Sequence, residues 1–113
     1  MVLALIRLAS TEPEAAASLL ENHWSVHLTP EQRSWAWGVI GKHSAQKLSD
    51  TANEHFAKAR DSELSDEHLG WKVRAAMRFA RWKDVLAATL AMSPEARQEP
   101  IWVYWRARAL LQL

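Results

Sequence analysis

The sequence lacks cysteine altogether and is poor in glycine and proline. Its 113 residues include no Cys, 3 Gly and 4 Pro. The missing thiols exclude disulfides and thiolate metal sites, and the scarcity of turn residues argues against a small β-sandwich or a glycine-lined phosphate site. Because cysteine-free proteins suit the cytosol and the periplasm equally well, the compartment stays open on this ground.

A surplus of one charge and a long apolar segment are also missing. Fourteen basic and thirteen acidic side chains leave a formal net charge of +1, so no strong field attracts nucleic acid. No segment approaches the roughly 20 apolar residues that span a bilayer. We therefore expect no nucleic-acid partner and no membrane span. The apolar segment Met1–Ala9 is interrupted by Arg7 and has no basic leader, which favours a helix end over a signal peptide.

Helix-starting motifs recur along the chain. Thr11–Glu14 and Thr29–Gln32 have the capping-box pattern with proline in the first turn, and Ser65 and Ser93 are capping hydroxyls followed by acids. The segments between them are rich in helix formers and poor in β-branched residues. The sequence predicts a single all-α domain over residues 1–113. Seven helices are expected near residues 2–9, 12–23, 30–46, 50–60, 66–79, 81–92 and 99–112.

Seven of the ten aromatic residues are tryptophan, and three of these are evenly spaced. Trp37, Trp71 and Trp105 lie 34 residues apart, each followed four positions later by a small residue. This period is typical of tetratricopeptide-type helix pairs, so the spacing favours a right-handed superhelix of helix pairs, with a compact bundle as the alternative. Neither end has the polar outer face of a terminal repeat, and we expect a fragment of a longer solenoid.

No group of residues forms a convincing catalytic or metal site in the sequence. His23 and His27 have the spacing of two metal ligands on a helix, but they cross a predicted helix end and lack a third ligand. Serine catalysis would need a nucleophile in a strained, glycine-rich turn. Glutamates expected at helix starts or in loops, where they cap helices or are solvated, are Glu12, Glu14, Glu31, Glu63, Glu67 and Glu95. We expect no catalytic residue, no metal and no cofactor.

Tryptophans and arginines are the remaining binding candidates. A tryptophan face can stack on a sugar ring, although large aromatics at helical spacing more often fill the space between helices. Both interpretations apply to Trp35, Trp37, Trp71, Trp82, Trp102 and Trp105. The basic surplus of the C-terminal half is either a solvated face or a docking strip for acidic or carbohydrate partners. The ligand-binding residues that we select from this region are Arg74, Arg78, Trp82 and Arg106.

Four segments resemble the helical region of the bacterial soluble lytic transglycosylases. They are Ala4–Ala9, Leu28–Trp37, Leu64–Arg78 and Trp102–Leu110. The most specific of them is the Trp-x-Tyr-Trp-x-Ala-Arg-Ala-Leu pattern of residues 102–110, which generic tetratricopeptide sequences do not share. The resemblance extends over nearly the whole chain.

The resemblance implies a periplasmic scaffold segment. Enzymes of this family cleave peptidoglycan glycan strands with 1,6-anhydromuramic acid formation, and their superhelical domain precedes a lysozyme-like catalytic domain. The family's catalytic Glu-Ser pair and Gly-Leu-Met-Gln segment do not occur here, so the catalytic domain is absent and no catalytic residue is carried over. The implied partners are the catalytic domain of the parent enzyme and glycan strands. The alternative function is a tetratricopeptide-like adaptor that binds a protein segment in its concave groove.

Overall fold

The chain is helical throughout the part that the structure describes. The computed structural model describes the backbone of residues 2–113 and the burial of residues 4–113, and this range contains no β-strand. The predicted all-α class is confirmed. In this range the eight α-helices are α1 (Val2–Thr11), α2 (Pro13–Leu19), α3 (Pro30–Gln46), α4 (Ala52–Ala57), α5 (Asp66–Arg78), α6 (Trp82–Ala91), α7 (Pro94–Arg97) and α8 (Pro100–Gln112). A π-helical turn (Leu20–Trp24) and two 3₁₀ turns (Ser25–His27 and Asp61–Glu63) connect some of them.

Local capping chemistry starts α3 and α5 as predicted. The Thr29 hydroxyl accepts a hydrogen bond from the Gln32 backbone N–H at 3.1 Å, and the Gln32 side chain accepts one from the Thr29 N–H at 2.9 Å. This reciprocal pair is a complete capping box. The Ser65 hydroxyl likewise accepts from the N–H of His68 at 3.2 Å. Each of these helices therefore begins at a residue whose hydroxyl accepts a hydrogen bond from an otherwise unpaired N–H group of the first turn.

The capping box predicted at Thr11 is wrong. Thr11 is the last residue of α1, and its hydroxyl lies 3.4 Å from the carbonyl oxygens of Arg7 and Leu8. Glu14 does not reach back to close the box, because its carboxylate accepts a hydrogen bond from Thr51 beside α4. Glu14 therefore bonds to a side chain 37 residues away and not to the backbone at Thr11.

The Ser93 cap starts a helix that the sequence did not predict. Ser93 accepts from the N–H of Ala96 and begins the single turn α7, which ends before Pro100. The residue before a proline is driven to extended backbone, and Glu99 has ψ 135°. Pro100 therefore separates α7 from α8 and begins the longer helix.

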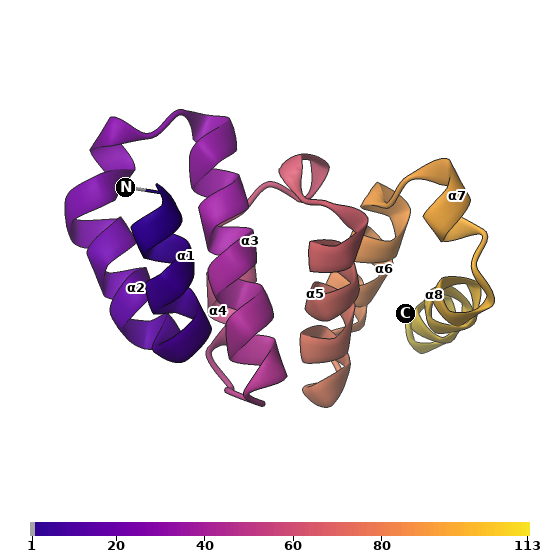
Figure 1. Cartoon of the computed structure of the whole chain (residues 1–113). Helices are drawn as coiled ribbons and strands as arrows, with labels where there is room; N and C mark the ends of the chain where they lie inside the picture. The colour runs from indigo at the N-terminus through magenta and orange to yellow at the C-terminus, as the bar shows by residue number, and fades with distance from the viewer. Residues whose placement is uncertain (1) are drawn as a thin grey trace.

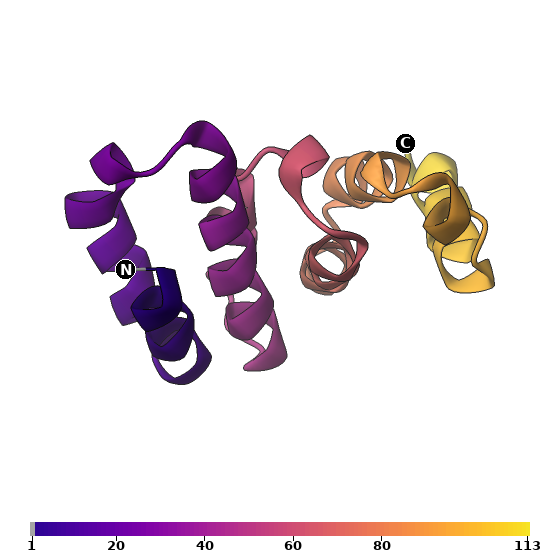
Figure 2. The ribbon, with the colours of Figure 1, turned by 45° about the horizontal axis from the view of Figure 1, so that its top comes forward.

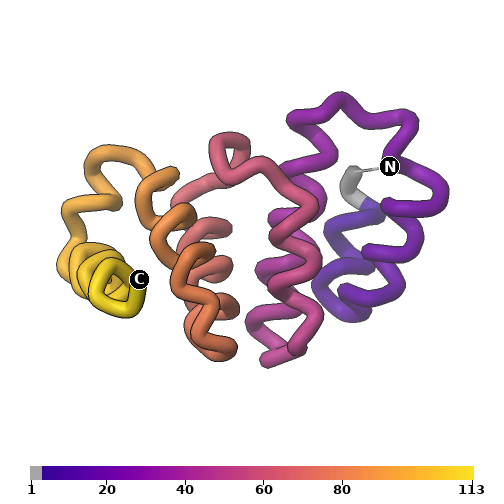
Figure 3. Tube along the Cα trace, turned by 180° about the vertical axis from the view of Figure 1, so that it is seen from behind, coloured from indigo at the N-terminus to yellow at the C-terminus, as the bar shows by residue number. Residues whose placement is uncertain are grey.

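Helices that are neighbours in the sequence are also neighbours in space. α1 packs against α2 and α3, α3 against α4 and α5, and α6 against α5 and α8. Figure 1 shows them as a row with the two termini at opposite ends, and Figure 3 shows the same row from behind. In Figure 2, α5 is seen nearly along its axis while α3 is seen from the side, so the helix direction changes along the row. The molecule is elongated, with extents of 41 × 25 × 20 Å.

The evenly spaced tryptophans lie in three successive long helices. Trp37 is in α3, Trp71 in α5 and Trp105 in α8. The first is buried, and the other two are half-buried against the core. The small residues four positions later are all buried, and they are Gly41, Ala75 and Ala109. The position four residues after each tryptophan is therefore buried in all three helices.

The core has two parts that meet beside α3. One part joins α1, α2 and α3 through residues such as Leu5, Leu20 and Ile40. The other runs from α3 to α8 and includes Phe56 and Val73. The middle of α3 is buried on all sides, whereas α8 buries only Trp102 and Ala109 completely and leaves much of its surface exposed.

Candidate functional site

The four residues selected from the sequence each contact their own neighbours. The Arg74 guanidinium lies over the Trp71 ring, 4.8 Å from its centroid, and 5.5 Å from that of Trp102. The Arg78 guanidinium lies 5.5 Å from the ring of Phe79, at the end of α5. Both arginines are exposed.

The other two selected residues lie on other helices. Trp82, at the start of α6, is half-buried with the Arg108 guanidinium 5.9 Å from its ring. Arg106 in α8 donates to the Arg97 carbonyl from both terminal nitrogens at 3.3 Å. The four residues lie on three helices, and within the described range no hydrogen bond or cation–π contact joins any two of them. A ligand-binding role for the four remains a prediction.

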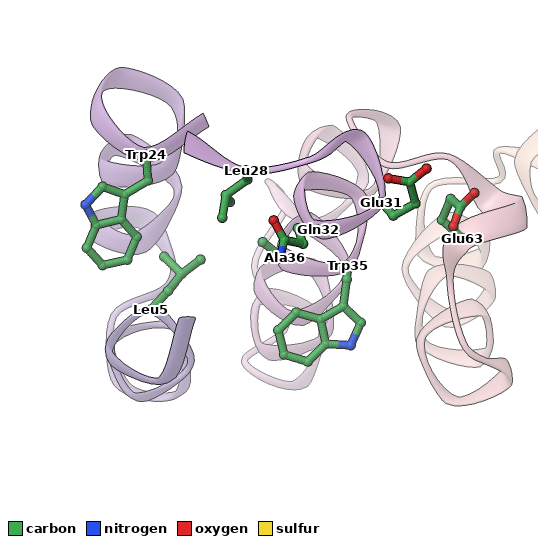
Figure 4. Close-up of a pocket in the computed structure, with 8 residues that line it drawn as sticks. All are labelled: Leu5, Trp24, Leu28, Glu31, Gln32, Trp35, Ala36 and Glu63. Carbon is green, nitrogen blue, oxygen red and sulfur yellow. The ribbon is translucent and has the colours of Figure 1, made fainter. Parts of the chain in front are cut away.

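A pocket lies at the N-terminal end of the molecule, between α1 and α3. Its volume is about 370 Å³, toward the lower end of the roughly 300–1,000 Å³ of small-molecule sites. We call it the α1–α3 pocket. Its lining, drawn in Figure 4, consists of Leu5, Trp24, Leu28, Glu31, Gln32, Trp35, Ala36 and Glu63.

The wall above the pocket is held in place by Arg33. This side chain donates from one nitrogen to the carbonyl oxygens of Ser25, at 2.9 Å, and Leu28, at 2.7 Å. Charge-assisted bonds of this kind are stronger than neutral ones. They tie the segment between the π-helical turn and α3 to α3 itself, which fixes the positions of Trp24 and Leu28.

The opposite wall is held by two further contacts. The buried Ser34 hydroxyl accepts from the Arg60 backbone N–H at 3.0 Å, which brings the segment after α4 onto α3. Lys72 of α5 pairs with Asp61 at 2.5 Å, and this anchors the 3₁₀ turn Asp61–Glu63. Glu63 at the end of that turn is thereby brought to the pocket, beside Glu31 of α3.

The pocket is apolar inside and acidic on one side. Figure 4 shows the Glu31 and Glu63 carboxylates together to one side of Trp35, with Trp24 and Leu5 across the pocket from them. No basic side chain lines the pocket. Among residues 4–113, no ion pair is found for either carboxylate. Trp35 is 36% exposed, the most open of the tryptophans.

A buried serine–histidine–glutamate chain crosses α3, α4 and α2. Ser44 Oγ lies 3.0 Å from His55 Nδ1, and His55 Nε2 lies 3.7 Å from a Glu14 carboxylate oxygen. Burial lowers the pKa of His55, although Glu14 acts in the opposite direction. When the neutral ring carries its proton on Nε2, facing Glu14, its Nδ1 accepts a hydrogen bond from the Ser44 hydroxyl. Ser44 is 0% exposed, so this hydroxyl cannot reach a substrate, and the chain of contacts ties three helices together.

The remaining sequence candidates do not converge on a site. His23 lies in the π-helical turn and His27 in the 3₁₀ turn, so their four-residue separation is not that of an α-helix. Among the described residues, no three histidine, aspartate or glutamate side chains gather as a metal site. No helix in the same range is long and apolar enough to cross a membrane.

Sequence reasoning missed the α1–α3 pocket as a unit. Trp35 was among the tryptophans with two interpretations, while Glu31 and Glu63 were assigned to a helix start and a loop. The available signal was Trp35 itself, which is two positions from the buried Trp37 and so lies on another face of α3. The sequence matches no known protein-family model, and no curated protein is significantly similar to it.

Proposed function

We propose that the chain is a non-catalytic segment of the superhelical scaffold of a periplasmic lytic transglycosylase. Its role is to help build a curved wall that seats the catalytic domain of the parent enzyme and confines a peptidoglycan glycan strand. The resemblance of residues 102–110 and three further segments to that family suggests this assignment. The proposal includes a right-handed superhelix of tetratricopeptide-like helix pairs.

The observation that carries the repeat interpretation is the uncovered face of α8. Its large exposed apolar residues are Ile101, Val103, Tyr104, Leu110 and Leu111. The residue 34 positions before Ile101 is the exposed Glu67, whereas those before the other four, all in α5, are Leu69, Gly70, Ala76 and Met77, of which three are buried and Met77 is half-buried. Four corresponding positions are therefore buried or half-buried in α5 and exposed in α8. This pattern supports a further helix that covers α8 in a longer array.

A peptidoglycan assay tests the function. Purified sacculi are incubated with the chain, and both cosedimentation and released muropeptides are measured. We expect cosedimentation without release, because the family's catalytic Glu-Ser pair and Gly-Leu-Met-Gln segment do not occur in the sequence. Released anhydro-muropeptides would overturn the non-catalytic assignment, and a chain that stays in the supernatant would overturn the glycan contact.

Matched variants locate the contact. Arg74→Ala/Arg78→Ala removes two exposed charges from the selected residues, and Arg7→Ala/Lys47→Ala removes two exposed charges from α1 and the C-terminal end of α3. We expect the first double variant to bind sacculi less well and the second to bind as the parent chain does. Equal loss in both would indicate non-specific attraction to the anionic wall.

The alternative is a tetratricopeptide-like adaptor that binds a protein segment. The α1–α3 pocket favours it, because an apolar pocket with an acidic side fits a basic protein side chain. The two functions differ in the same assay, since an adaptor does not cosediment with protein-free sacculi.

A further inference from the structure

We propose that the α1–α3 pocket binds an arginine side chain that a partner peptide presents between apolar residues. The residues that line and support this pocket carry the proposal. It is therefore independent of the proposed scaffold function.

The size and lining of the pocket fit one long side chain with an apolar stem. Its volume is about 370 Å³, and Leu5, Leu28 and Trp24 supply an apolar interior. The methylene stem of arginine can lie along such a surface while its charged head stays at the edge. The Arg33 and Ser34 contacts hold both walls in place, so little ordering is needed on binding.

The charge of the pocket selects a cation. Two carboxylates, Glu31 and Glu63, lie on the same side of it, and no basic side chain is among its lining residues. Between residues 4 and 113, no ion pair involves either of them. An anionic ligand would be repelled here, and a neutral sugar would leave both negative charges without a counter-charge. A guanidinium supplies that charge together with several N–H donors for carboxylate oxygens.

Trp35 favours arginine over lysine. Its indole is partly exposed and lines the same pocket as the two carboxylates (Figure 4). A guanidinium is planar, stacks on an aromatic face and can donate to a carboxylate in the same position, whereas an ammonium is a compact and strongly hydrated point charge. The apolar neighbours in the peptide would cover the rim next to Trp24 and Leu28.

The test compares two peptides that differ in charge alone. Acetyl-Leu-Arg-Leu-amide and the same peptide with citrulline, a neutral isostere of arginine, are titrated into the full chain at low salt. Binding is followed by the indole N–H resonances of Trp24 and Trp35. We expect the arginine peptide to bind at least about tenfold more tightly, because charge-assisted bonds are lost in the other. A lysine peptide should bind less tightly than the arginine peptide.

Charge-matched variants assign the effect to the pocket. Glu31→Gln/Glu63→Gln should abolish the preference for arginine over citrulline. Glu12→Gln/Glu95→Gln removes the same total charge at two exposed positions outside the pocket and should leave the preference intact. All four glutamates are exposed, so the variants should keep the parent melting temperature.

Four outcomes would overturn the proposal. These are equal binding of the two peptides, no binding of the arginine peptide at millimolar concentration, an arginine preference that survives Glu31→Gln/Glu63→Gln, and tighter binding of chitotriose than of the arginine peptide at the same indole resonances. Binding of free ethylguanidinium as tight as that of the peptide would replace the peptide partner by a small organic cation.

Discussion

Gly41 in α3 lies directly against the ring of Phe56 in α4. A Cβ atom on Gly41 would stand 2.9 Å from three carbons of that ring, and Phe56 is 0% exposed. The two helices therefore approach as closely as they do because position 41 has no side chain. The small residue that follows Trp37 by four positions is a packing requirement between this helix pair.

Gly41→Ala should destabilise the protein despite the better helix propensity of alanine. The substitution gains about 1 kcal/mol in propensity, while overpacking a filled core costs about 1–3 kcal/mol. We expect a net loss of about 1 kcal/mol in the free energy of unfolding, measured by urea denaturation. In the Phe56→Leu background, where the ring is gone, the same substitution should be neutral or stabilising. A loss of equal size in both backgrounds would contradict the contact.

Ala80→Gly and Leu48→Gly should each stabilise the chain. Ala80 and Leu48 have φ angles of 55° and 57°, a left-handed conformation that costs a residue with a Cβ roughly 1–2 kcal/mol. Both follow a helix end, where glycine is the usual residue. We expect a gain of about 0.5–1 kcal/mol at each position, seen as a higher denaturation midpoint.

A matched control separates this effect from a general response to glycine. Ala87 is exposed within α6, where the backbone is helical. Ala87→Gly should lower the free energy of unfolding by about 1 kcal/mol. A loss at position 80 as well would show that its strain is relieved in solution.

Stability should fall as the pH is lowered from 7.5 towards 5. Burial lowers the pKa values of His55 and His68 below the ordinary 6.5. Between that value and the lower folded pKa, the unfolded chain binds more protons than the folded chain, so the free energy of unfolding decreases as pH falls. Well above pH 6.5 both states are neutral at these positions, and the contribution becomes constant.

The buried Nδ1 atom of His68 has no hydrogen-bond partner within the described structure, which makes its protonation costly. His68→Gln cannot titrate and should reduce the slope of unfolding free energy against pH. His23→Gln, at an exposed position, is the control for replacing a histidine by glutamine. A parent chain whose stability is flat from pH 7.5 to 5 would contradict the prediction.

Local signals in the sequence predicted the helices, and contacts between distant residues explain where the prediction was wrong. The Thr29 and Ser65 caps depend on atoms three residues away, so their patterns were sufficient. Thr11 and Glu14 have the same pattern, but Glu14 is drawn to Thr51. A capping-box pattern indicates which local hydrogen bonds a segment can form. It does not indicate which distant side chains lie nearby once the chain has folded.

The pocket was beyond sequence reasoning for a related reason. Glu63 and Glu31 line the same pocket, and the segment that carries Glu63 is held by the pair of Asp61 with Lys72 and by the hydrogen bond from Arg60 to Ser34. Each of these contacts joins segments 11 or 26 residues apart. Composition predicted correctly that most tryptophans pack against the core, but the partly exposed Trp35 needed a structure to show its acidic neighbours.

The ion pair between Lys72 and Asp61 should support both stability and the pocket. Their side chains are 11% and 23% exposed, so Lys72→Met leaves a poorly solvated carboxylate without its cation. We expect a loss of about 1–2 kcal/mol in the free energy of unfolding, because Asp61 keeps some contact with water. Since Asp61 anchors the turn that carries Glu63, the arginine peptide should also bind less tightly although Lys72 does not line the pocket.

Lys42→Met is the matched control for this effect. Lys42 pairs with Glu67 at the surface, where the side chain of Glu67 is 61% exposed, and pairs of this kind contribute little because water already solvates them. The control should leave the arginine affinity unchanged. If Lys72→Met lowered stability but left the affinity intact, the turn would hold Glu63 in place without the ion pair, and the α3 contact of Arg60 with Ser34 would be the support that matters. Ser34→Ala, which removes that hydrogen bond alone, would then be the variant that weakens binding.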